Sequence, residues 1–169
     1  GGLLLTGYLL ADTGSTSCLL LKTDQHGNES WRKYISKALG YAVFQDSASK
    51  KIIIAGTQYG HSFTCIIVTD SIGNVVFRGS RYIYGGLCTD LLQLNDGHAV
   101  ACGYLYDPNG SVMSTPFAYK FEINDPTITH WDLAVYKGFE LVNIFNCAAP
   151  LNDTTIIVAG IYDTTTTSG

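Results

Sequence analysis

The chain is a succession of short apolar runs separated by polar turns, and one such pattern is clearest at 19–36, LLLKTDQHGNESWRKYIS. An aliphatic run ends at Asp24, the tetrad from Asp24 to Gly27 turns the chain, and a second extended run carries Trp31. An Asp side chain can accept a hydrogen bond from the backbone two residues on, and Gly adopts the positive φ that a tight turn needs. The pattern therefore predicts a β-hairpin.

Two weaker copies of this hairpin follow, IVTDSIGNVVFRGSRYIY at 67–84 and FEINDPTITHWDLAVY at 121–136. In the second copy Asp70, Gly73 and Phe77 take the places of Asp24, Gly27 and Trp31, and in the third copy Asn124 and Trp131 take the places of the Asp and the Trp. We interpret these residues as structural members of a repeat.

A second recurring element is an aliphatic run that closes on a glycine: LLLTG, IIIAG, AVACG and IIVAG, which end at Gly7, Gly56, Gly103 and Gly160. These glycines are 49, 47 and 57 residues apart. Together with the hairpin and one more extended segment, each unit contains four predicted strands. We place the units at 1–50, 51–98 and 99–154, with a fourth beginning at 155 and a threonine-rich tail or linker at 163–169.

Self-similarity at 40–50 residues with four strands per unit is typical of propeller blades. We therefore expect an all-β, propeller-type array of four-stranded antiparallel blades: three blades plus one strand, within a larger or oligomeric propeller. The flanking strands GGLLLTGYLL and TIIVAGIY are as apolar as the interior ones, although repeat arrays need polar caps. We expect the remainder of a longer chain, or a second copy, to cover them.

Composition excludes several classes of partner. The chain of 169 residues is 46% hydrophobic and 14% charged, with a net charge of −4. Its ten Lys and Arg are scattered singly, so no basic face is expected and nucleic acid is an unsuitable partner. No apolar run is long enough to span a membrane. The four histidines show no metal-ligand spacing, and we expect neither a metal nor a cofactor.

The motif Leu-Leu-Lys-Thr-Asp-x-x-Gly-Asn-x-x-Trp at 20–31 resembles the repeats of bacterial and archaeal secreted or cell-surface β-propeller proteins. The resemblance is good over 1–98 and loose over 99–160. It implies a non-catalytic binding or scaffold module, extracellular or at the cell surface, whose loops contact a protein or a carbohydrate. Three Asn-x-Ser/Thr sequons, at Asn28, Asn109 and Asn152, agree with this location.

The binding residues of such a module are expected where loops leave the glycine-ended runs. Tyrosine is suited to binding faces because it combines an apolar ring with a polar tip. Five of the eleven tyrosines follow these runs: Tyr8, Tyr59, Tyr104, Tyr106 and Tyr162.

The alternative function is enzymatic. The sequence DTGS at 12–15 follows an apolar run and resembles the active-site loop of aspartic proteases, in which two carboxyl groups share a proton. The chain contains this loop once, so Asp12 would need a second copy in a homodimer. The five cysteines form no CxxC pair, and we expect them to be buried free thiols.

Overall fold

The computed structural model contains strands and turns throughout the residues that it describes, and the expected all-β class is confirmed. It describes residues 1–10, 14–60, 63–80, 86–106, 114–124, 132–135, 143–152 and 155–162. Over these ranges it has no helix of the length and apolarity needed to cross a membrane.

The strands form antiparallel sheets in which each strand pairs with its neighbour in sequence. The first sheet contains β1 (Leu4–Leu10), β2 (Thr16–Thr23) and β3 (Glu29–Ser36). The second contains β4 (Ala38–Gln45), β5 (Ile52–Gln58), β6 (Phe63–Thr69) and β7 (Val75–Ser80). The third contains β8 (Gly86–Gln93), β9 (His98–Tyr106), β10 (Ser114–Glu122) and β11 (Asp132–Val135), and the fourth β12 (Asn143–Pro150) and β13 (Ile156–Tyr162).

The grouping of strands into sheets differs from the units that we drew in the sequence. β4 falls in the first sequence unit, yet it pairs with β5 and so opens the second sheet. The connection from β3 to β4 is Lys37 alone, at φ 57°. Hairpin loops need at least two residues, so the chain leaves the first sheet here instead of folding back on β3.

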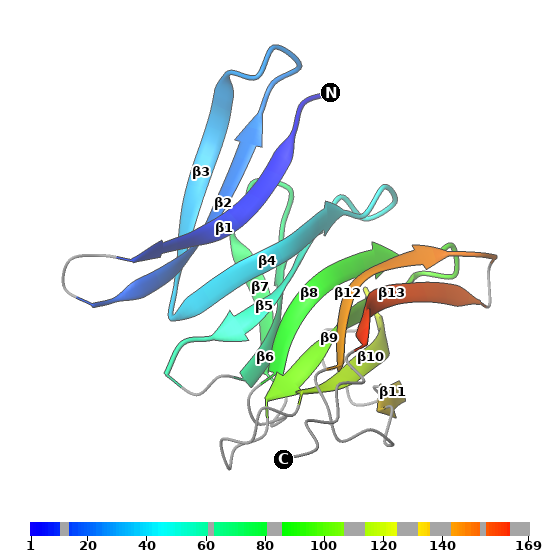
Figure 1. Cartoon of the computed structure of the whole chain (residues 1–169). Helices are drawn as coiled ribbons and strands as arrows, with labels where there is room; N and C mark the ends of the chain where they lie inside the picture. Colours follow the sequence, from blue (N-terminus) through cyan, green and yellow to red (C-terminus); the bar gives the residue numbers. More distant parts are fainter. Residues whose placement is uncertain are drawn as a thin grey trace.

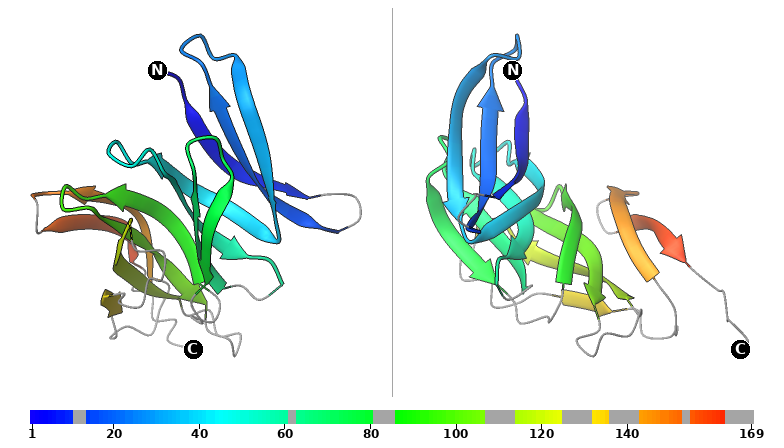
Figure 2. Two further views of the ribbon diagram at one scale, coloured as in Figure 1. Left: turned by 180° about the vertical axis from the view of Figure 1, so that it is seen from behind. Right: turned by 60° about the vertical axis from the view of Figure 1, so that its left-hand side comes forward.

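The sheets pack face to face in chain order, as the right-hand view of Figure 2 shows from the first sheet to the fourth. Successive residues of a strand point to opposite faces, so the apolar run of β5 serves two cores. Ile52 and Ile54 pack with Cys18 and Leu20 of the first sheet, and Ile53 packs with residues of the third. A further core joins Val100 and Ala118 to Ile156 and Val158 of the fourth sheet.

The recurring glycines Gly56 and Gly103 both lie beneath a β-bulge of the preceding strand. The pairing of β4 with β5 shifts register next to Gly56, and that of β8 with β9 shifts next to Gly103. A Cβ atom at Gly56 would fall on the carbonyl oxygen of Leu39, and one at Gly103 on that of Leu87. Close backbone approach, rather than a positive φ, therefore requires glycine at these positions.

The two hairpin turns of the repeat have the same hydrogen bonds. Asp24 Oδ1 accepts from the backbone N–H of His26 at 2.8 Å and of Asn28 at 3.0 Å. Asp70 Oδ1 accepts from Ile72 and Asn74 in the same way, at 3.0 and 2.8 Å. Gly27 and Gly73 have φ values of 85° and 83°, so both copies use glycine for its left-handed backbone.

We predict that Gly56→Val lowers the free energy of unfolding by more than ~1 kcal/mol, because the added side chain must displace the backbone of β4. Urea denaturation measures the change. The matched control is Gly7→Val at the same dilute protein concentration, where association of chains does not contribute, since Gly7 has the same place in the repeat but no atom within 4 Å of its Cβ position within one chain. Equal stability of Gly56→Val and the wild type would contradict the bulge.

Candidate functional site

The strands that carry or precede Tyr8, Tyr59 and Tyr104, namely β1, β5 and β9, end toward one edge of the stack, at the lower left of Figure 1. Tyr8 is 51% exposed in β1, and its ring lies 6.3 Å from that of Tyr41 at a tilt of 58°. Tyr59 follows β5, is 46% exposed, and donates its backbone N–H to the carbonyl of Lys37 at 3.1 Å. Two exposed phenol rings are thus available at this edge.

The other three predicted tyrosines contribute less to this edge. Tyr104 is half-buried within β9. Tyr106 and Tyr162 are the last residues of β9 and β13, and their side chains lie outside what the structure describes. We define the tyrosine edge by Tyr8 and Tyr59.

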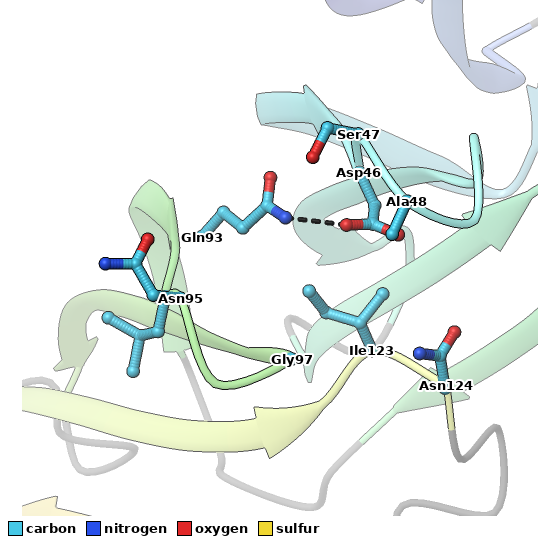
Figure 3. A pocket seen from close by; sticks show the side chains of 9 residues that line it. Asp46, Ser47, Ala48, Gln93, Asn95, Gly97, Ile123 and Asn124 are labelled. Carbon is cyan, nitrogen blue, oxygen red and sulfur yellow. Dashed lines mark hydrogen bonds between the residues drawn. The ribbon is translucent and has the colours of Figure 1, made fainter. Parts of the chain in front are cut away.

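The opposite edge, formed by tight turns, contains a pocket that the sequence did not predict. Its volume is about 370 Å³, and it lies between the second and third sheets (Figure 3). It is lined by the turns that follow β4, β8 and β10, through Asp46, Ser47, Ala48, Gln93, Leu94, Asn95, Gly97, Ile123 and Asn124. Its polar lining consists of the hydroxyl of Ser47, the amides of Gln93, Asn95 and Asn124, and the carboxylate of Asp46.

Asp46 connects the two sheets at this pocket. The side chain is 5% exposed; Oδ1 accepts from Gln93 Nε2 at 2.6 Å, and Oδ2 accepts from Ser49 N at 2.6 Å and Ser49 Oγ at 2.5 Å. Hydrogen bonding to Ser49, above all its hydroxyl, lowers the pKa of Asp46 despite the burial, with a smaller contribution from Gln93. Both oxygens are occupied, so the carboxylate is a structural anchor and not a free base.

A glutamine ends the first strand of the second sheet and the first strand of the third sheet, and each glutamine forms a hydrogen bond to the preceding sheet. Gln93 ends β8 and reaches Asp46 of the second sheet, while Gln45 ends β4 and accepts from Lys22 Nζ of the first sheet at 3.2 Å. The recurrence of Gln45 and Gln93 is the sequence signal that could have indicated an inter-sheet contact here.

A charged cluster stands beside the pocket on the third sheet. Lys120 Nζ lies 2.6 Å from Asp96 Oδ2, and this bond is the main reason that the pKa of Asp96 falls to about 2. His98 donates its backbone N–H to Asp96 Oδ1 at 3.1 Å and lies 3.8 Å from Glu122. These contacts hold the β8–β9 turn against β10.

The aromatic residues of the repeat pack between sheets. Trp31 packs on the core between the first and second sheets, where its ring lies 2.9 Å from the position of a Cβ at Gly73. Phe77 packs on the core between the second and third sheets. Trp131 lies outside the described residues.

The remaining candidate residues, for proteolysis and for metal binding, do not form a site among the residues that the structure describes. Asp12 lies outside the described residues, while Gly14 and Ser15 of the same motif are exposed. Among the residues that the structure describes, no group of His, Cys, Asp and Glu could hold a metal ion. None of the nine residues that line the pocket is a histidine, cysteine or lysine, and its one carboxylate, Asp46, already accepts hydrogen bonds from Gln93 and Ser49.

The cysteines follow the expectation with one correction. Cys18, Cys65, Cys88 and Cys102 are buried free thiols, but Cys147 is exposed. Burial raises the pKa of the first four, that of Cys102 to about 11, so they are protonated and unreactive at neutral pH. Cys147 is exposed because it lies on the face of the fourth sheet that is turned away from the third.

Comparisons with known proteins add no relative: no family model, no curated protein and no solved structure matches the chain.

We predict that Asp46→Asn destabilises the protein at neutral pH by about 1–3 kcal/mol, because an amide cannot accept all the bonds that the carboxylate accepts. The pKa of Asp46 is lowered from 3.8 in the folded protein. The stability that the ionised carboxylate contributes is therefore fully present above pH 3.8, and it is lost as the pH falls through the lower pKa of the folded state. The difference from wild type should therefore shrink in acid. Urea denaturation at pH 7 and below pH 3.8 measures it, with Ser47→Ala as the control. A constant difference would contradict the role of the ionised carboxylate.

Proposed function

We propose that the sheets are consecutive blades of a β-propeller and that the protein is a non-catalytic binding or scaffold module. The observation that supports this proposal is the serial packing of antiparallel sheets, of which the second and third share the same glycine opposite a β-bulge. Repeated stacking of this kind presents the ends of many strands along one edge, where loops can vary without disturbing the cores.

The tyrosine edge is the proposed contact surface. Tyr8 and Tyr59 both expose about half of their surface there. Exposed tyrosines are effective contacts because their rings bury large areas at a low cost in conformational entropy, and their hydroxyl groups pair with polar partners. The same chemistry fits a sugar ring or an apolar protein surface, so the partner is a glycan or a protein.

A secreted or cell-surface location is part of the proposal. Two of the three sequon asparagines, Asn28 and Asn152, are exposed in turns, as glycosylation requires. Asn109 lies outside the described residues.

We predict that the labelled protein binds members of a glycan array or a panel of purified extracellular proteins, and that the double variant Tyr8→Ala, Tyr59→Ala loses most of this signal. Ile72→Ala is the control, because Ile72 is 57% exposed but lies in a turn at the opposite edge. Equal signals for the double variant and the control would rule out the tyrosine edge.

The proteolytic alternative has a separate test. No described contact places a second carboxyl group beside the DTGS motif, and the proposed module needs no catalysis. We therefore expect no acid-pH peptidase activity that pepstatin inhibits. Activity that Asp12→Asn abolishes would replace the proposed function with an aspartic protease.

A further inference from the structure

The first sheet has an unpaired edge where the second and third sheets have a strand. β5 and β9 pair with β4 and β8 on the side where the bulges lie. β1 occupies the same place in the repeat, but among the described strands only β2 pairs with it. The backbone groups on the other side of β1 are therefore available to an added strand.

Gly7 shows what kind of strand would fit this edge. The equivalent Gly56 and Gly103 are covered by the carbonyl groups of Leu39 and Leu87, whereas no atom lies within 4 Å of the Cβ position of Gly7. β1 thus has the glycine that a bulged neighbouring strand requires, although no described strand pairs with β1 on that side. A strand with the same bulge would fill this space.

The side chains around Gly7 are also uncovered. Leu3 and Leu5 are 62% and 44% exposed, while Ile52 and Ile54, at the same distances before Gly56, are fully buried. Ile52 and Ile54 are covered by the first sheet, so Leu3 and Leu5 are exposed because no described sheet packs on the outer face of β1; this apolar face adjoins the open edge.

The strand best suited to this edge within the chain is β12. It belongs to the same series as β4 and β8, and its pairing with β13 shifts register between Phe145 and Cys147, opposite Gly160. Gly160 is the repeat equivalent of Gly7, so β12 already pairs with a strand of the β1 type. β13 has β12 as its only described partner and exposes 53% of Ile157. β13 is held to the third sheet through Ile156 and Val158, so β1 of a second copy would have to displace it from β12.

We propose that the unpaired edge of β1 is a docking site for β12 of a second copy of this chain. In that second copy, one edge of β12 pairs either with its own β13 or with β1 of the first copy. The pairing with β1 completes the first sheet as a four-stranded sheet with the bulge over Gly7. If β12 of each copy pairs with β1 of the other, the arrangement is a closed two-fold dimer. This inference shares the repeat with the proposed function but does not depend on the tyrosine edge.

The variant Gly7→Val tests the docking site directly. Size-exclusion chromatography with light scattering should give twice the 18.3 kDa chain mass for the wild type and a halved mass for Gly7→Val. The thermal midpoint of the variant should not depend on protein concentration, as that of the dimeric wild type should, because the added side chain meets open space within one chain and only prevents association. A monomeric wild type, or a Gly7→Val protein that remains dimeric, would overturn the proposal.

A peptide of residues 143–150 carrying Cys147→Ser gives a second measurement if Gly7→Val fails to fold. The fluorescent peptide should bind the wild-type chain and convert the dimer to monomer, whereas Gly7→Ala, which adds only a Cβ atom, should bind it at least tenfold more weakly. A scrambled peptide is the control. Equal binding to both proteins, or none to the wild type, would refute the site. No glycan or protein ligand is used, so this failure is distinct from failure of the proposed function.

Discussion

The structure depends on burial of apolar side chains on both faces of its middle sheets. Ile52 and Ile53 are adjacent in β5, and both are fully buried, one against each neighbouring sheet. A sheet with two apolar faces is stable only between two others, so each unit requires its neighbours. The stack is therefore the unit of stability, and its outermost faces are where exposed aliphatic residues such as Leu3 and Ile157 occur.

Polar contacts between sheets fix how each sheet is placed on the next. Arg78 Nη1 of β7 donates to the carbonyl of Ser36 at 2.8 Å, and Lys33 Nζ of β3 lies 3.2 Å from Asn74 Oδ1. On the other side of the stack, Asp90 Oδ2 accepts the backbone N–H of Ala148 in β12 at 2.8 Å. Hydrogen bonds are directional, so these contacts select one arrangement among the many that apolar packing alone permits.

Sequence predicted the parts that are local. The Asp24 and Asp70 turns close through bonds that span at most four residues, and glycine is the residue type that their backbone requires. The division into sheets was not predictable in this way, because it depends on Lys37 adopting a left-handed backbone conformation. Gly or Asn at this position would have indicated such a conformation in the sequence, but Lys does not. The pocket was missed for a related reason: Asp46 and Gln93 are 47 residues apart and meet only after the sheets stack.

The sizes of the side chains between consecutive sheets favour a fan instead of a flat stack. The first strands of the second and third sheets carry small residues at Gly40, Ala42 and Cys88, beside Phe44 of β4, which also packs in a core, and β8 packs on β4, β5 and β6. Large rings occur on the outer strands, where Trp31 of β3 and Phe77 of β7 fill the space between sheets. Close approach at the first strands and wider separation at the last strands would make each pair of sheets a wedge. Wedges that are stacked with their narrow sides together curve around the first strands of the sheets, such as β4 and β8. This is the geometry that the proposed propeller requires.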